Sequence, residues 1–252
     1  MKRLIVISFV FACSMSLVMA QSTSEKRVSP LTVGAFGGLN IPDLTGGGGN
    51  PLSSGWSSRS GIAYGLTFNW NTGTHFAWQA DVLYSSEGGQ RNGLQAFMAN
   101  PDPTTQSVMP YLYANIKNAS ELNYLEIPIM GKFLIPVTKT SNFYVDFGPY
   151  VGILLNAKQI TSGSSTVYGD MAGTIQIGGT KSFDASTDIT NQINTINFGL
   201  TGGFGFSQAV GFGSVFLDFR GAYGLTTIQN NSQNGDNHTG NLCISLGYSI
   251  PL

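Results

Sequence analysis

Apolar and small polar residues alternate along most of the chain, and the longest such stretch covers residues 122–155. Because successive side chains of a strand point to opposite faces, the alternation predicts two strands joined by a polar turn at residues 138–142. One face of this pair is apolar throughout, and the other carries the charged residues. The apolar face comprises Leu125, Ile127, Ile129, Phe133, Ile135, Phe143, Val145, Phe147, Val151, Ile153 and Leu155.

The same alternation predicts six further strands, at residues 31–40, 61–71, 74–85, 193–207, 213–225 and 240–252. Long loops at residues 41–60, 86–120, 156–192 and 226–239 follow strands one, three, five and seven. Short turns follow strands two, four and six. An even strand number with this asymmetry is typical of bacterial outer-membrane barrels, whose turns face the periplasm and whose long loops lie outside.

Composition decides which face of the strands meets lipid. Charged residues make up 10% of the chain, against about 25% in ordinary soluble domains. The polar faces consist mainly of Gly, Ser, Thr and Asn with isolated charges, which suits a confined lumen better than a solvated surface. The sequence therefore predicts an all-β fold, an eight-stranded antiparallel up-and-down transmembrane β-barrel with its apolar face in lipid.

Aromatic residues and prolines refine this barrel. Aromatic side chains fall near both ends of the strands, where interfacial girdles are expected. They are Trp70, Phe76, Phe133, Phe143 and Phe206 near the short turns, and Tyr64, Tyr84 and Tyr223 toward the long loops. Pro128 and Pro149 lie inside strands of a closed barrel, which has no free edge for a residue without an N–H group. We therefore expect bulges at these two positions.

The first twenty residues are typical of a signal peptide. Lys2 and Arg3 precede an apolar run over residues 4–18, and the segment ends in Val18-Met19-Ala20. Lipid attachment at Cys13 is the alternative, although Phe11 makes the preceding residues a poor match for it. We expect a signal peptide over residues 1–20, a short polar lead over residues 21–30 and one outer-membrane barrel domain over residues 31–252.

Removing the signal peptide leaves ten basic and thirteen acidic residues, a formal charge of −3, which argues against a nucleic-acid partner. Cys243 is then the single remaining cysteine, so an intrachain disulfide is excluded. Apolar runs in the mature chain are far shorter than the ~20 residues that a membrane helix needs. A membrane can therefore be crossed only with strands.

Candidate catalytic and metal-binding chemistry is sparse. His75 and His238 are the two histidines, and neither has a cysteine or a carboxylate pair at metal-ligand spacing. Outer-membrane lipid A deacylases carry an H-x-S pattern near the last strand, but here Gly240 stands two residues after His238. Phosphate-binding and G-x-S-x-G motifs are absent from the sequence. We expect no catalytic, cofactor-binding or metal-binding residues, no cofactor and no enzyme activity.

Charged residues on the inner faces of the strands form the one candidate constellation. Asp218 and Arg220 are two residues apart on one strand, so both point the same way, opposite to Leu217 and Phe219. An eight-stranded interior is about wide enough for side chains only. The preferred interpretation is a buried ion-pair network, and the alternative is a gated polar path. The predicted network comprises Asp81, Glu126, Lys132, Asp146, Asp218 and Arg220.

The string Leu122-Asn123-Tyr124-Leu125-Glu126-Ile127-Pro128-Ile129, with the hairpin that follows it, resembles the signature of the PorT-like family of outer-membrane β-barrels. Members are often called porin family proteins. The resemblance covers the mature chain from about residue 31 to residue 252 and implies a small barrel of the OmpA and OmpX type. Residues 242–252 are similar to the C-terminal sorting strand of such proteins, although Leu252 stands where an aromatic residue is usual.

These features together predict a protein of the bacterial outer membrane. We expect outer-membrane lipid and, during biogenesis, the barrel-assembly machinery as partners, and a monomer as the working form. The expected function is non-enzymatic, a structural, adhesive or accessory role in which the long loops are the interaction surface. Their sequence identifies no ligand. The alternative is a narrow porin-like channel or an accessory component of protein secretion across the outer membrane.

Overall fold

The structure, a computed structural model, describes residues 30–98, 111–231 and 235–252. Eight of its strands form a closed antiparallel ring, because β1 pairs with β11 and β5 pairs with both β4 and β9. In ring order they are β1 (Leu31–Gly46), β2 (Gly61–Asn71), β3 (Phe76–Met98), β4 (Tyr111–Pro136), β5 (Ser141–Ser162), β9 (Ile196–Val210), β10 (Gly213–Gly224) and β11 (Asn237–Pro251). The predicted all-β, eight-stranded barrel is confirmed.

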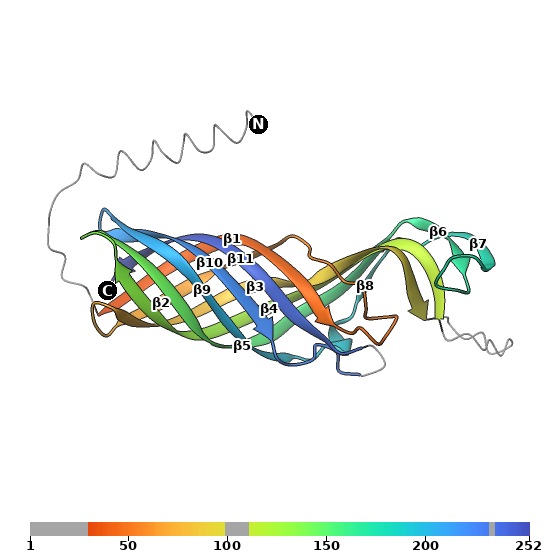
Figure 1. The fold of residues 1–252 in the computed structure, drawn as a ribbon, viewed down its shortest axis with the longest axis horizontal. Helices are drawn as coiled ribbons and strands as arrows, with labels where there is room; N and C mark the ends of the chain where they lie inside the picture. Colours follow the sequence, from red (N-terminus) through yellow and green to blue (C-terminus); the bar gives the residue numbers. More distant parts are fainter. Residues whose placement is uncertain (1–29, 99–110, 232–234) are drawn as a thin grey trace, which may run out of the picture.

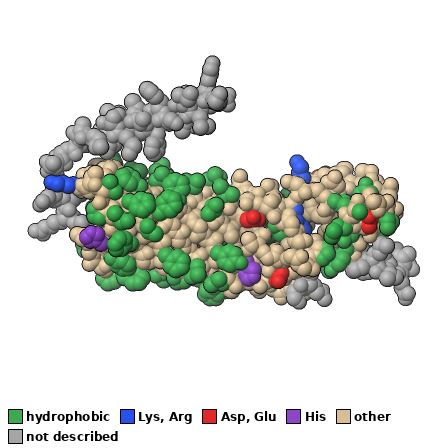
Figure 2. Space-filling model, viewed as in Figure 1, with side chains coloured by type: hydrophobic (Ala, Val, Ile, Leu, Met, Phe, Trp, Pro, Cys, Tyr) green, Lys and Arg blue, Asp and Glu red, His purple; other side chains and the backbone are tan. Residues whose placement is uncertain are grey.

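The ring turns apolar side chains outward and polar ones inward. Ile62, Phe147 and Leu246 are 57%, 62% and 60% exposed on the outside, whereas inward-facing Asp81 and Met130 are fully buried. Figure 2 shows the resulting apolar surface over the barrel portion of the molecule. No helix in the described part of the chain is long and apolar enough to cross a membrane.

The short turns after β2, β4 and β9 lie at the same end of the barrel as the C-terminus (Figure 1). At this short-turn end the Leu252 amide donates to the Leu31 carbonyl, and the Ala209 amide donates to the Thr140 carbonyl. The long connections lie at the opposite, long-loop end. The predicted signal peptide, residues 1–20, and all but Pro30 of the predicted polar lead, residues 21–30, lie outside the described residues.

All four predicted long loops are wrong in extent. The loop predicted at residues 41–60 is shorter because β1 continues to Gly46, and the loop predicted at residues 226–239 is shorter because β11 begins at Asn237. The other two differ more. In the predicted loop at residues 86–120, β3 continues to Met98 and β4 begins at Tyr111, and the two remain paired throughout; residues 99–110 lie outside the described part. In the predicted loop at residues 156–192, β5 continues to Ser162. Three added strands and one short helix follow it, β6 (Ser164–Tyr168), β7 (Gln176–Ser182), β8 (Ala185–Asp188) and η1 (Thr190–Gln192).

These longer strands form an extension that projects beyond the barrel at the long-loop end (Figure 1). The β6 strand pairs with β4 and β7, and β8 pairs with β5. Sequence alternation was not visible here because the apolar outer face that marks a strand in lipid is not required beyond the membrane. We call β6, β7, β8 and the outer parts of β3, β4 and β5 the extension.

The bulges expected at Pro128 and Pro149 are not found. Pro128 lies opposite Tyr150, and the same β4–β5 register continues on the far side of both prolines. The register shift between these strands lies instead at Asn123 and Tyr124. At Gly148, next to Pro149, a Cβ atom would lie 2.0 Å from the Ile129 carbonyl oxygen. The two strands approach so closely beside Pro149 that only glycine fits.

We therefore expect Gly148→Ala to lower the yield of folded barrel. Backbone atoms of β4 would have to move, and overpacking of this kind typically costs about 1–3 kcal/mol or more. The measurement is the fraction of mature protein that migrates differently on gels without heating, after refolding in detergent. Gly221→Ala is the matched control, because its Cβ would meet nothing closer than 3.6 Å. Equal folded fractions for the two variants would contradict this account of the close approach.

Candidate functional site

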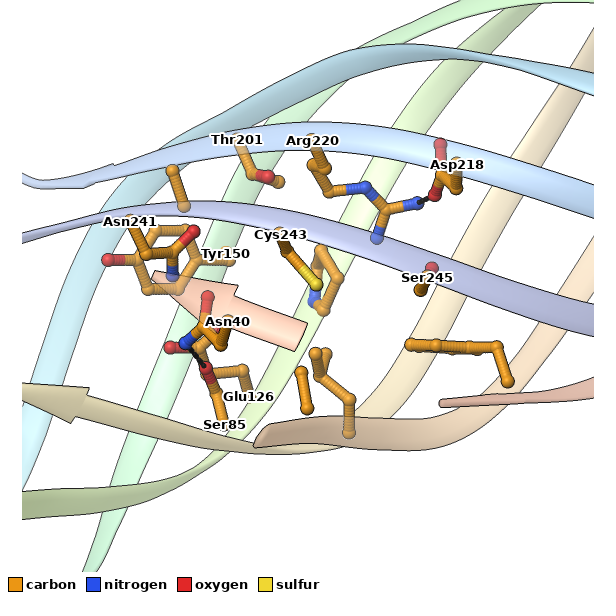
Figure 3. A pocket seen from close by; sticks show the side chains of 15 residues that line it. Asn40, Ser85, Glu126, Tyr150, Thr201, Asp218, Arg220, Asn241, Cys243 and Ser245 are labelled. Atoms are coloured by element: carbon orange, nitrogen blue, oxygen red, sulfur yellow. Dashed lines mark hydrogen bonds and ion pairs between the residues drawn. The ribbon is translucent and has the colours of Figure 1, made fainter. Parts of the chain in front are cut away.

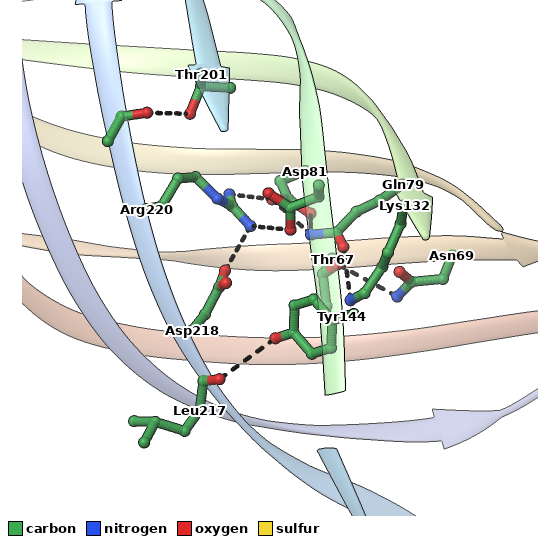
Figure 4. Close-up of polar contacts among 12 residues, drawn as sticks. Thr67, Asn69, Gln79, Asp81, Lys132, Tyr144, Thr201, Leu217, Asp218 and Arg220 are labelled. Atoms are coloured by element: carbon green, nitrogen blue, oxygen red, sulfur yellow. Dashed lines mark hydrogen bonds and ion pairs between the residues drawn. The ribbon is translucent and has the colours of Figure 1, made fainter. Parts of the chain in front are cut away.

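Arg220 lies at the centre of the lumen and contacts carboxylates from three strands (Figure 4). Its Nη1 donates to Asp81 Oδ2 at 2.8 Å, and its Nη2 donates to Asp218 Oδ2 and lies 3.7 Å from Asp146 Oδ2. Asp81 is on β3, Asp146 on β5 and Asp218 on β10, beside Arg220 itself. One guanidinium thus joins opposite walls of the barrel. Its three partners are almost completely buried.

Lys132 joins this group indirectly, through a residue that the sequence interpretation did not include. Its Nζ donates to Gln79 Oε1 at 2.9 Å, and Gln79 Nε2 in turn donates to both carboxylate oxygens of Asp81, at 3.0 and 3.1 Å. The Lys132 ammonium also lies 3.6 Å from the centre of the Tyr144 ring. Gln79 is two residues from Asp81 on the same strand, so its side chain also points into the lumen, and this spacing is the sequence signal for its part in the network.

Glu126 lies apart from the other five predicted residues. No ion pair involves it among the described residues. It lines a small lumen cavity of about 30 Å³ together with Arg220, Asn40 and Tyr150 (Figure 3). The structure therefore brings Asp81, Asp146, Asp218 and Arg220 into direct contact, links Lys132 to them through Gln79, and leaves Glu126 on the far side of the cavity.

A second polar layer, toward the long-loop end, was missed altogether. The buried Glu87 carboxylate accepts hydrogen bonds from Asn40 Nδ2, Ser85 Oγ and Asn241 Nδ2 through its Oε1. These residues come from β1, β3 and β11. The sequence pattern predicts a loop at Glu87 and therefore gives no direction for its side chain. Because β3 in fact continues past residue 85, the Glu87 side chain points into the lumen, as those of Asp81 and Ser85 do.

The lumen is filled at mid-height and hollow at both ends. Between the two polar layers the cavity holds about 30 Å³, the volume of about one water molecule in the liquid. Larger cavities of about 300 Å³ lie at the long-loop end and at the short-turn end. Tyr144 and Met130 also fill the interior and are almost completely buried. The widest spaces of the interior therefore lie at its two ends.

The two histidines lie far from these layers. His75 is in the turn after β2, where its Nδ1 is 2.9 Å from the Thr74 hydroxyl, and His238 stacks on Tyr223 in β10. Within the described ranges, no three His, Cys, Asp or Glu residues are grouped so that they could hold a metal ion.

Loop carboxylates build the outermost part of the extension. Asp170, between β6 and β7, accepts hydrogen bonds from the Ile175 amide at 2.7 Å and from the Thr174 hydroxyl at 2.7 Å. These bonds favour the ionised form and hold the pKa of Asp170 below its ordinary value. A hydrogen bond from the Gly163 amide likewise lowers the pKa of Asp184. The ionised carboxylates thus order the turns that connect the added strands.

A closed ring of eight strands, with an apolar outside and a filled polar interior, defines an integral β-barrel membrane protein. The chain belongs to the family defined by the outer membrane protein beta-barrel domain, whose model matches residues 19–230. The protein is accordingly located in the bacterial outer membrane, with the short turns in the periplasm and the long-loop end outside. The narrower PorT-like resemblance stays a prediction.

Solved outer-membrane proteins of low sequence identity are similar to this chain. Ail, the attachment invasion locus protein of Yersinia pestis, is 11% identical over 87% of this chain and 98% of its own, with a TM-score of 0.37. Neisserial surface protein A is 12% identical over 90% and 100%, with a TM-score of 0.39. OprG from Pseudomonas aeruginosa is 10% identical over 91% and 100%, with a TM-score of 0.38. A search of curated proteins found no match.

We expect Arg220→Leu to be strongly destabilising, because it leaves buried carboxylates without their cation. Removing one partner of a buried ion pair costs about 3–5 kcal/mol. Adding Asp218→Leu should recover only part of this loss, since Asp81 and Asp146 remain. The measurement is urea unfolding in lipid vesicles, followed by tryptophan fluorescence.

Thr201→Val is the matched control for a lumen substitution without a charge. Its hydroxyl donates to the Gly221 carbonyl at 3.1 Å, and losing one such bond costs about 1 kcal/mol. If Thr201→Val and Arg220→Leu lower the free energy of unfolding equally, the ion pairs of Arg220 contribute no more to stability than one neutral hydrogen bond.

Proposed function

We propose that this protein is a non-enzymatic outer-membrane barrel whose extension binds a macromolecular partner, in an adhesive, structural or accessory role. The supporting observation is the length of three adjacent strands. β3, β4 and β5 have 23, 26 and 22 residues, whereas β2 and β10 have 11 and 12. A membrane-spanning strand needs about 9–11 residues. Half of each long strand is thus available for a structure outside the membrane.

The tip of the extension has the properties of an interaction surface. Met171, Ile175 and Ile177 are 67%, 54% and 52% exposed there, in a part of the molecule that projects beyond the barrel (Figure 1). Exposed apolar groups outside the membrane are costly in water and mark sites of association. β7 and β8 are also the terminal strands of the sheet order, so each has an edge not paired within the sheet. Such edges can accept an added strand from a partner.

The lumen supports a scaffold role rather than a catalytic one. Arg220 contacts three aspartates, and Glu87 Oε1 accepts from three polar side chains, so the main charged groups of the lumen are engaged with one another. A general base held within reach of a nucleophile is the usual sign of acid–base or covalent catalysis. Assembly as a monomer by the barrel-assembly machinery is part of the same proposal.

The tip is tested with the double substitution Ile175→Ser and Ile177→Ser. We expect cells producing this variant to lose attachment to one another and to plates coated with extracellular-matrix protein, roughly tenfold relative to wild type, because one lost apolar anchor is worth about 1–2 kcal/mol. Attachment is counted in a deletion strain carrying each version. The control is Val210→Ser with Phe212→Ser, which alters exposed apolar residues at the short-turn end. Wild-type attachment by the tip variant would refute the proposal.

A narrow channel is the second candidate, and the two large cavities favour it. The two polar layers, with Tyr144 and Met130, separate a cavity of about 300 Å³ at each end. Joining the cavities would require both the Arg220 group and the Glu87 group to rearrange. An accessory role in secretion across the outer membrane belongs to this transport alternative.

Recording from single molecules in planar bilayers separates the two candidates. For a plugged barrel we expect no steady conductance from wild type. A steady conductance that changes with Arg220→Leu would favour the channel. If a strain that lacks this protein still exports other proteins normally, the secretion role is contradicted. If that strain has an export defect and the tip variant restores export, the secretion role is favoured over the adhesive role.

A further inference from the structure

The cavity at the long-loop end is enclosed by parts of the chain that are far apart in sequence. It holds about 300 Å³ and lies between the β1–β2 connection, the outer parts of β3 and β4, η1 and the segments next to residues 228 and 237. Sites for small molecules begin at about this volume. Its lining residues include Trp56, Arg91, Gln95, Phe97, Asn118 and Phe183. None of the lining residues is an aspartate or a glutamate.

Arg91 is the one described arginine without a carboxylate partner. Arg59 pairs with Glu121 at 3.1 Å, and Arg220 pairs with three aspartates. Arg91 is only 6% exposed, its Nη1 donates to the Ser54 carbonyl at 3.1 Å, and its guanidinium lies 4.5 Å from the centre of the Trp56 ring. Its Nε has no hydrogen-bond partner in the described chain. A buried guanidinium is always charged and strongly favours a carboxylate or phosphate partner.

Other buried polar atoms in the cavity also lack partners in the described chain. They are Gln95 Oε1, Asn118 Oδ1 and Trp56 Nε1. Gln95 and Asn118 are 8% and 4% exposed, and Gln95 Nε2 is held by the Ile116 carbonyl at 2.7 Å, which fixes the direction of its oxygen. An unpaired buried polar group costs about 1–3 kcal/mol. The wall of the cavity thus contains one cation without a carboxylate partner, and two acceptors and one further donor without hydrogen-bond partners among the described residues.

The walls of the cavity are aromatic and aliphatic. Phe97 and Phe183 pack edge to face at 5.4 Å between ring centres, and Trp56 packs against a cluster that includes Leu44, Ile189 and Ile193. All six side chains line the cavity. Flat apolar groups pack against aromatic rings in stacked or edge arrangements. A ligand that satisfies both the walls and the polar atoms therefore has an aromatic body, one anionic group and a hydrogen-bond donor.

We propose that this cavity binds a small aromatic carboxylate that also carries a hydroxyl or amino group. Its carboxylate pairs with Arg91, its ring packs against the aromatic walls, and its hydroxyl or amino group donates to Gln95 or Asn118. This site does not rest on the proposed function, because it lies where the barrel meets the extension and leaves the tip free. It adds capture of a small molecule at the long-loop end of the barrel.

Calorimetric titration of the full mature protein in detergent tests the site, with 4-hydroxybenzoate as the probe and neutral 4-hydroxybenzamide as its partner compound. We expect the acid to bind wild type about tenfold or more tightly than the amide, since a charge-assisted hydrogen bond contributes about 1.5–3 kcal/mol. Arg91→Met should abolish the preference. Arg59→Met, which removes an arginine already paired with Glu121, should keep it.

Two further measurements keep the result decisive if Arg91→Met does not fold. Asn118→Leu retains Arg91 and should reduce the preference for 4-hydroxybenzoate over benzoate. Probe binding should also change the fluorescence of wild type but not that of Trp56→Phe, whose remaining tryptophans, Trp70 and Trp78, lie on the outer face of the barrel. No measurable binding of the acid, equal binding of acid and amide, or displacement of the acid by inorganic phosphate at equal concentration would overturn the proposal.

Discussion

The ion pairs of Arg220 are the constraint on which this barrel depends. A closed ring removes every free strand edge in the membrane, but its interior must then be filled by side chains that cannot reach water. Arg220 meets this need by contacting aspartates on β3, β5 and β10 at once. Because those strands lie on different sides of the ring, the pairs fix both the filling of the lumen and the relative positions of its walls. Such a group discriminates against other registers, since a shift by one residue would place a charge in lipid.

The parts of the fold that could be predicted are those where lipid imposes a two-residue period. Trp70, Trp78, Phe147 and Leu246 alternate with polar or small neighbours, so the eight strands and their inward faces were readable from the sequence. Asp218 and Arg220 followed from parity alone. The predictions were wrong where the alternation of side-chain direction carries no information, such as the length of the strands beyond the membrane. Residues 86–93 lack an apolar outer face, so their pattern predicts a loop, although β3 continues through them to Met98.

The candidate sites show the same division. Contact between Arg220 and the three aspartates depends on which strands face each other, and the ring order constrains this strongly. The separate position of Glu126 depends on height along the barrel, which a two-residue period does not specify. Arg91 and Gln95 could not be placed for a different reason. Their cavity is assembled by connections between strands, where the sequence shows no regular period, so the meeting of Trp56 with Arg91 was visible only in three dimensions.

A single register between β3 and β4 links the membrane portion to the extension. The pairs run from Phe76 with Phe133 to Met98 with Tyr111, with a gap at Asp81 and Val82. The orientation of the outer structure is therefore set by the barrel wall, and a load applied at the tip is transmitted along hydrogen-bonded strands to the bilayer.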